Sequence, residues 1–292
     1  MEYMRKFSES FKLTKPGIAV LLDLVAITGF ILGLGDLSLL WKIFPLLFAG
    51  TFASFSSSLT NNYLDRDIDS QMARTKWRTG IGSRLWYIAS ISSLLAASII
   101  VSYVFLNAFT TLWIFLGYLS YSFLYTLVLK RRTSWNIVLG GIAGSFPALA
   151  GWSAINSPIS MVSIFLAILV FLWTPTHFWT LAIKYREDYR RAGIPMMPSV
   201  KNEKTSVNYI IINTAILIVF SIIPVIFNMG FPFLYRYLVI PVSIYLLIRV
   251  ILLRTREGGD LKKYSIKAFL ASNYYLTAIL ILLLAGSLIR FI

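Results

Sequence analysis

The stretch Asn61–Thr75, NNYLDRDIDSQMART, brings three aspartates within five residues to the end of a segment that is almost free of charge. The twenty residues before it, WKIFPLLFAGTFASFSSSLT, carry a single charged side chain, Lys42. An apolar run of about 20 residues is long enough to cross a bilayer as a helix. We therefore predict a transmembrane helix near residues 41–62 whose end carries the acidic residues.

The composition of the whole chain points to the same class of protein. Of its 292 residues 58% are hydrophobic and 13% are charged, and the mean hydropathy is +0.75. A soluble domain has about 25% charged residues. Apolar runs of about 20 residues recur, whereas the alternation of a membrane β-barrel is absent, so we predict an all-α integral membrane protein. Cysteine is absent, which excludes disulfides and thiolate metal sites.

Nine transmembrane helices in a single membrane domain, residues 1–292, are predicted from the apolar runs. The first run has no small-residue cleavage site after it, so we interpret it as a retained helix and not as a signal peptide. The predicted helices lie near residues 17–35, 41–62, 85–106, 108–129, 136–154, 159–182, 207–228, 232–253 and 268–289.

The basic residues predict how the chain is oriented in the membrane. Of the 27 Lys and Arg residues, 24 precede the first helix or lie in alternate loops, and the other side holds only Lys42, Arg236 and Arg290. Cytoplasmic loops are enriched in Lys and Arg, so we predict a cytoplasmic N-terminus and an outside C-terminus in a multi-pass plasma-membrane protein. This distribution also accounts for the net charge of +15 without a nucleic-acid partner, which would need a soluble basic face.

Small residues suggest which helices lie inside the bundle. Gly, Ala and Ser crowd the segments 41–62 and 136–154, and small residues allow neighbouring helices to approach closely. The last two predicted helices are rich in Leu and Ile and are expected to face lipid. The aspartates after residue 62 are therefore expected to face a cavity in the protein.

Asn61, Asp65 and Asp69 are spaced four residues apart. At about 100° per residue they drift by only about 80°, so they form one polar stripe if the helix continues past the membrane, with Asp67 on the opposite side. A solvated helix end is the alternative reading. Three oxygen-bearing side chains on one stripe suit Mg²⁺, which binds through carboxylates and substrate phosphates. Basic residues that could bind a phosphate follow at once: Arg74, Lys76 and Arg78.

A second polar cluster follows the predicted helix 159–182, in HFWTLAIKYREDYRRAGIPMMP from His177 to Pro198. Lys184 and Asp188 are four residues apart and share a helix face. Two such patches at one end of apolar helices predict a metal–diphosphate site with an apolar pocket below it. A site of this kind can ionise an allylic diphosphate, because Mg²⁺ and cationic side chains stabilise the leaving group.

The first motif resembles the aspartate-rich motif N-x-x-x-D-x-x-x-D of the UbiA-type membrane prenyltransferases. Its DRDID core and the following RT are similar to the haem O synthase branch of that family. YTLVLKRRTSWNIVLGGIAGSFPALAGW from Tyr125 and FLWTPTHFWTLAIKYREDYRRAGIPMMP from Phe171 are similar to the other two signature regions of the branch. The resemblance covers roughly residues 15–200.

The resemblance implies an enzyme reaction. A Mg²⁺-dependent transferase of this branch moves the farnesyl group of farnesyl diphosphate to a vinyl group of haem B, with water addition, and releases haem O and diphosphate for haem–copper oxidase cofactor synthesis. One alternative is a UbiA-type enzyme with a phenolic or lipid acceptor. Another is a membrane transporter, which would have charges near the bilayer midplane and broken helices.

The resemblance also implies roles for eight residues around the diphosphate. The catalytic residues are Asp65, Asp69 and Asp188. The Mg²⁺ ligands are Asn61, Asp65, Asp69 and Asp188. The diphosphate contacts are Asn61, Arg74, Arg78, Lys130 and Lys184. In this last group, Lys184 stands where many relatives have the first acid of a second D-x-x-x-D motif.

His177 and Asp23 are ionisable residues inside predicted helices that need a separate explanation. His177 is the sole histidine, and it is either a contact to haem or a hydrogen-bonded interior residue. Asp23 either pairs with a basic side chain or lines the cavity. The expected cofactor is Mg²⁺ alone, because haem B is a substrate. The expected surroundings and partners are the lipid bilayer, the two substrates and, as a candidate, a haem A synthase or terminal-oxidase assembly.

Overall fold

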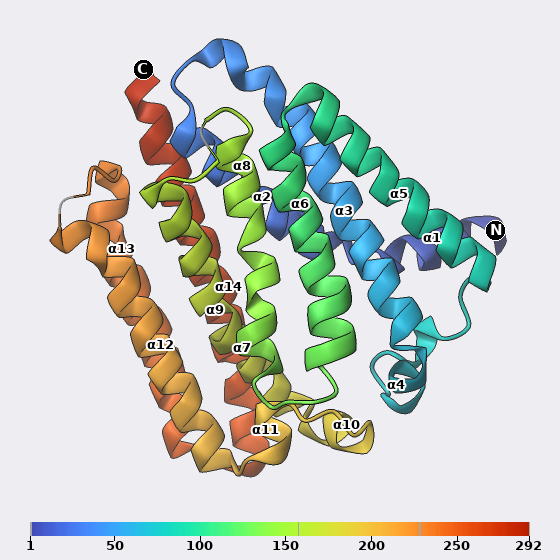
Figure 1. The fold of residues 1–292 in the computed structure, drawn as a ribbon. Helices are drawn as coiled ribbons and strands as arrows, with labels where there is room; N and C mark the ends of the chain where they lie inside the picture. Colours follow the sequence, from blue (N-terminus) through green and yellow to red (C-terminus); the bar gives the residue numbers. More distant parts are fainter. Residues whose placement is uncertain (1, 157, 228, 292) are drawn as a thin grey trace.

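The computed structural model describes residues 2–156, 158–227 and 229–291, and every regular element in them is helical (Figure 1). Eight helical segments are long and apolar enough to cross a membrane. They are Pro16–Gly33, Leu37–Leu64, Arg84–Phe105, Ala108–Leu129, Met161–Lys184, Glu203–Ile226, Phe233–Thr255 and Gly258–Leu288. Each lies on one of the predicted spans, with ends that differ by up to ten residues.

The spans are built from the following labelled elements. The amino-terminal half contains α1 (Glu2–Leu13), α2 (Pro16–Gly33), α3 (Ile43–Leu64), α4 (Arg66–Gln71), α5 (Arg84–Phe105) and α6 (Ala108–Leu119), which continues as a π-helix over Ser120–Leu129. The rest contains α7 (Asn136–Gly140), α8 (Phe146–Ser153), α9 (Met161–Lys184), α10 (Arg186–Arg191), α11 (Met197–Val200), α12 (Glu203–Ile226), α13 (Phe233–Ile251) and α14 (Gly258–Leu288).

The predicted helix near 136–154 is helical in three parts. The chain there forms α7, a 3-10 turn over Gly141–Gly144 and α8. Glycines weaken the α-helix at the 3-10 turn, and Pro147 lies in the first turn of α8, where the backbone N–H that proline lacks would have no partner within the helix. The described residues therefore hold eight long spans and one shorter segment that is divided by a 3-10 turn.

The last helix also differs from its prediction. It begins at Gly258, ten residues earlier than predicted. Its first turns carry charged side chains, so a search for apolar runs does not include them in the helix. It packs against α9, α13 and α2, and Tyr275, Leu276 and Ile279 are fully buried. The expectation that this helix faces lipid therefore fails for its buried face, while Leu270, Tyr274 and Ile281 on the helix are exposed.

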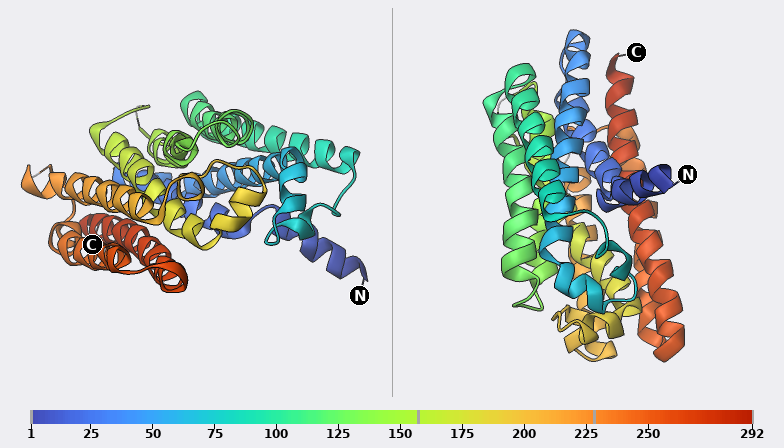
Figure 2. Two further views of the ribbon diagram at one scale, coloured as in Figure 1. Left: turned by 90° about the horizontal axis from the view of Figure 1, so that it is seen from below. Right: turned by 90° about the vertical axis from the view of Figure 1, so that its right-hand side faces the viewer.

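The helices pack so that both polar clusters lie at the same end of the bundle. α2 packs against α8 and α3, while α9 packs against α12 and α14. The short helices α4, α10 and α11 all lie at the lower end in Figure 1, and the C-terminal end of α14 lies at the opposite end. Two further views show α1 projecting sideways from the bundle (Figure 2).

The orientation in the membrane stays a prediction, which epitope tags would test. Tags inserted near Arg131 and Lys201 should be accessible from the cytoplasm, and a tag at Ile292, which lies outside the described residues, should be accessible from the other side. A C-terminal tag on the cytoplasmic side would contradict the orientation predicted from the charges.

The contact between α2 and α8 depends on Gly151. A Cβ at this position would clash with the Ala26 carbonyl oxygen and would lie 2.8 Å from Ala26 C and 3.0 Å from Phe30 N. Backbone atoms cannot give way as flexible side chains do, so Gly151→Ala should lower the melting temperature in detergent by several degrees. Gly259→Ala is the matched control, because no atom lies within 4 Å of its added Cβ. Equal melting temperatures would contradict the close approach.

Candidate active site

A cavity of about 450 Å³ runs from the polar end of the bundle into its interior. Its polar end is lined by Lys15, Asn61, Asp69, Arg74, Arg78 and Lys130. Its deeper walls are mainly apolar and include Val25, Ala53, Ile114, Phe146, Val170 and Leu276. The cavity can therefore hold a molecule with an anionic head at one end and an apolar body below it.

Asn61, Asp65 and Asp69, the polar stripe, stay aligned although the helix that carries them is interrupted. α3 ends at Leu64 and α4 begins at Arg66, but Asp65 N donates to Asn61 O (2.9 Å) and Asp69 N to Asp65 O (2.7 Å). The four-residue spacing is thus kept. Asn61, Asp65 and Asp69 are at most 4% exposed, whereas the side chain of Asp67 is 59% exposed.

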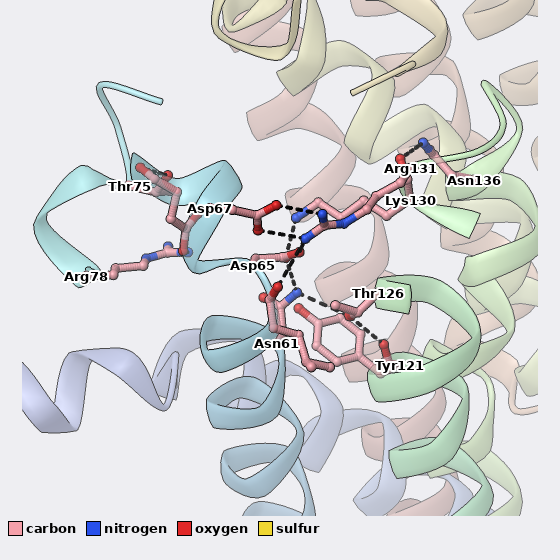
Figure 3. A network of polar contacts seen from close by, with 12 residues as sticks. Asn61, Asp65, Asp67, Thr75, Arg78, Tyr121, Thr126, Lys130, Arg131 and Asn136 are labelled. Atoms are coloured by element: carbon pink, nitrogen blue, oxygen red, sulfur yellow. Dashed lines mark hydrogen bonds and ion pairs between the residues drawn. The ribbon is translucent and has the colours of Figure 1, made fainter. Parts of the chain in front are cut away.

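Asp65 is held by side chains from two parts of the chain (Figure 3). Its Oδ2 accepts hydrogen bonds from Lys130 Nζ (2.5 Å) and Asn61 Nδ2 (2.6 Å), and Asn61 Nδ2 also lies 3.2 Å from Thr126 Oγ1. Its Oδ1 accepts no hydrogen bond and lies 3.6 Å from Arg131 Nη2. The carboxylate is therefore fixed in place, and its Oδ1 has an ion-pair contact but no hydrogen bond.

Asp69 has a second buried oxygen that accepts no hydrogen bond. This Oδ2 lies 3.6 Å from Arg78 Nη1, with which it forms an ion pair. Buried carboxylate oxygens without a hydrogen bond are unusual, and hard oxygen ligands are those that Mg²⁺ prefers. Within the described residues, no group of three or more His, Asp or Glu side chains is placed to hold a metal. Two carboxylates and one amide fit a metal whose shell is completed by phosphate oxygens.

Lys15 is a site residue that sequence reasoning missed. Its Nζ donates to Asn61 Oδ1 (2.6 Å) and Tyr121 Oη (3.1 Å). Burial, followed by the charge of Arg78, lowers the pKa of Lys15 to about 7. An anion in the cavity would oppose both effects, so the ammonium is placed to bind one. The only sequence signal was its position directly before Pro16, the first residue of α2.

Arg131 explains why Asp67 stands apart from the stripe. Its guanidinium donates two hydrogen bonds to Asp67, at 2.7 and 2.8 Å, and one to Leu64 O at 3.0 Å. The hydrogen-bonded Arg131 guanidinium lowers the pKa of the Asp67 carboxyl. This pair ties α4 to the loop after the π-helix and leaves Asp67 outside the cavity.

The second polar cluster is only partly brought to the cavity. Arg74 lines it and stacks its guanidinium 4.7 Å from the Tyr185 ring centre. Lys184 is exposed and does not line the cavity. Asp188 is buried but pairs with Arg191 (2.7 Å) and does not line the cavity either. The structure therefore does not place Lys184 and Asp188 with the other predicted site residues.

Two polar residues lie deeper in the same cavity. His177 lines it with Nδ1 3.1 Å from Ser272 Oγ, so it is both hydrogen-bonded and accessible from the cavity. Asp23 also lines it, and its Oδ2 accepts a hydrogen bond from Thr51 Oγ1 at 2.7 Å. Of the two readings of Asp23, the structure supports the cavity-lining one.

The chain is similar to known proteins in sequence and in fold. The sequence profile of the UbiA prenyltransferase family matches residues 23–273. Protoheme IX farnesyltransferase 2 of Picrophilus torridus is 43% identical over 76% of this chain and 78% of its own. The protoheme IX farnesyltransferases of Thermoplasma volcanium (35% identical, 94% and 96% of the two chains) and Saccharolobus islandicus (36%, 99% and 100%) are similar over nearly their whole lengths.

Solved structures share the fold at low sequence identity. A digeranylgeranylglyceryl phosphate synthase matches with a TM-score of 0.75 at 17% identity over 97% of this chain and 99% of its own. A UbiA homologue from Archaeoglobus fulgidus, solved with DMAPP and Mg²⁺, matches with a TM-score of 0.69 at 17% identity over 93% and 99%. The predicted class, a helical multi-pass membrane bundle, is confirmed.

Proposed function

This chain belongs to the UbiA prenyltransferase family, and from that premise we propose that it transfers the farnesyl group of farnesyl diphosphate to a vinyl group of haem B. The observation that carries the proposal is the continuity of one cavity from a cationic, carboxylate-bearing end to an apolar interior that contains the chain's sole histidine. Three relatives are named protoheme IX farnesyltransferase, and we take the farnesyl donor and the haem acceptor from that name.

The polar end is proposed to bind the diphosphate. Lys15, Arg74, Arg78 and Lys130 line it and would contact phosphate oxygens. Asn61 and Asp69, which line it too, would hold Mg²⁺ together with Asp65, which is hydrogen-bonded to Asn61 and Lys130 at the cavity wall. Bound there, Mg²⁺ would stabilise the negative charge that develops on the leaving diphosphate. This arrangement does not use Asp188, which pairs with Arg191, or Lys184, which is exposed.

The proposed reaction balances without a redox partner. The C1–O bond of farnesyl diphosphate breaks and its electron pair leaves with the diphosphate. The π electrons of a haem vinyl group form the new C–C bond, and a water molecule adds to the resulting cation and loses a proton. The chain stabilises the leaving group with fixed cations and encloses the apolar reactants between helices.

A choice of acceptors tests the proposal against the closest rival in the same family. Purified protein with farnesyl diphosphate and Mg²⁺ is given either haem B or a phenolic acid. We expect a farnesylated haem and no farnesylated phenol. A farnesylated phenol with unchanged haem would show that the acceptor is a phenol and that the protein is still a prenyltransferase. Transport of either compound without any farnesylated product would contradict the assignment as a prenyltransferase.

His177 is proposed to contact the haem, because it lines the apolar part of the cavity and imidazole binds iron well. His177→Ala should shift the absorption spectrum of bound haem B and lower activity, while the affinity for farnesyl diphosphate stays within about twofold of the unaltered protein. An unchanged spectrum together with normal activity would mean that the ring only packs against its neighbours.

A further inference from the structure

The His177 ring is fixed by contacts from its own helix and from α14. It stacks on Trp173 at 4.3 Å between ring centres and lies 4.5 Å from the ring of Phe269. Its Nδ1 lies 3.1 Å from Ser272 Oγ, and the Trp173 indole N–H donates to Ser272 O at 2.7 Å. The Nδ1 atom of the ring is therefore within hydrogen-bonding distance of Ser272, and the neighbouring rings leave the imidazole little freedom to rotate.

The proton of the Ser272 hydroxyl decides which ring nitrogen is protonated. Ser272 Oγ donates to Phe269 O at 2.7 Å, one turn back along α14. A hydroxyl has one proton to donate, so while it makes this bond it can only accept from His177, and the Nδ1 atom then carries the hydrogen. In a neutral imidazole the other nitrogen then has a free lone pair. No hydrogen bond among the described residues uses Nε2, and the side chain lines the cavity.

We infer that Ser272 is a positioning residue that holds His177 in the Nδ1–H form and so presents the Nε2 lone pair to the cavity as a ligand for the acceptor's iron. The role of iron rests on the proposed function, whereas the tautomer does not. Hydrogen bonds to the second nitrogen of a ligating histidine orient the ring and raise its basicity, and losing them lowers metal affinity by about 10- to 100-fold.

The presence of a single histidine makes the tautomer directly measurable. Protein labelled with ¹⁵N-histidine and purified without a histidine tag gives two ring-nitrogen signals, and we expect those of a neutral ring protonated at Nδ1. Ser272→Ala should move the signals towards the Nε2–H form, and Ser272→Thr should restore the original pattern. Nε2–H in the unaltered protein, or no change in Ser272→Ala, would overturn the inference.

Ser265 provides a matched control on the same helix. Its hydroxyl is buried and donates to Lys262 O at 2.8 Å. As in Ser272, the acceptor is the carbonyl oxygen three residues earlier, but Ser265 makes no hydrogen bond to a histidine among the described residues. Ser265→Ala should leave the histidine signals unchanged. A shift equal to that of Ser272→Ala would show a general disturbance of α14 and overturn the specific role.

Titration with ferric haem B tests the ligand role. Ser272→Ala should weaken haem binding by about tenfold and alter the absorption bands of bound haem, with the affinity for farnesyl diphosphate unchanged. If haem binds with identical bands and affinity in this variant, the positioning role is wrong. If the tautomer and the haem titration are as expected but the unaltered protein never farnesylates haem, the proposed function fails and the inference stands.

Discussion

Replacing Asp65 by asparagine should abolish measurable turnover, with a loss of about 100- to 1,000-fold in kcat that added Mg²⁺ does not restore. Asparagine keeps the size of the side chain and can still accept a hydrogen bond from Asn61. It removes the charge that faces Lys130 at 2.5 Å and one of the two carboxylate oxygens proposed to bind the metal. The measurement is single-turnover formation of diphosphate at several Mg²⁺ concentrations.

Asp67→Asn is the control for this variant. Asp67 lies two residues away but is exposed and paired with Arg131, so its replacement should cost less than about fivefold, because surface ion pairs contribute little. The melting temperature of both variants separates lost catalysis from lost folding. Equal loss of activity in two well-folded variants would mean that the buried stripe does not define the metal site.

Replacing Lys15 by methionine should weaken farnesyl diphosphate binding by about 10- to 100-fold and leave haem B binding unchanged. The estimate follows from the loss of a charge-assisted hydrogen bond, which is worth about 1.5–3 kcal/mol. Lys15 lies at the cavity beside Asn61 and Tyr121 and has no carboxylate among its hydrogen-bond partners. The measurement is a binding titration with farnesyl diphosphate and a separate one with haem B.

Lys184→Met is the matched comparison, since the sequence predicts a diphosphate contact there and the structure places the side chain at the surface. We expect its affinity for farnesyl diphosphate to stay within about twofold of the unaltered protein. A larger loss of farnesyl diphosphate affinity in Lys184→Met than in Lys15→Met would show that Lys184 contacts the diphosphate. It would contradict the proposed set of cations at the polar end of the cavity.

The membrane class and the acidic stripe were predictable because both depend on residues close together in sequence. Apolar runs set the spans, and four-residue spacing keeps Asn61, Asp65 and Asp69 on one side even though α3 ends at Leu64. The interrupted segment at 136–154 was not predicted, because its small residues were interpreted only as packing surface. The effect of glycine and proline on helix continuity was overlooked.

Partners that arrive from distant parts of the chain were not predictable from local pattern. Lys15 reaches Asn61 from 46 residues away. Lys130 was assigned a diphosphate contact, but its bond to Asp65 spans 65 residues and no spacing rule gives it. Asp188 lies beyond the end of α9, where the chain turns at Tyr185, and its carboxylate pairs with Arg191. The four-residue spacing from Lys184 therefore does not place both side chains on one face of a continuous helix.

The mass of the product is the most direct test of the proposed function. Purified protein is incubated with farnesyl diphosphate, haem B and Mg²⁺ in ¹⁸O-labelled water, and the porphyrin products are separated and weighed by mass spectrometry. We predict a new haem whose mass exceeds that of haem B by one farnesyl group and one labelled hydroxyl group, formed together with one diphosphate. Unchanged haem B, while the same protein releases diphosphate from farnesyl diphosphate, would contradict the assignment of haem as the acceptor.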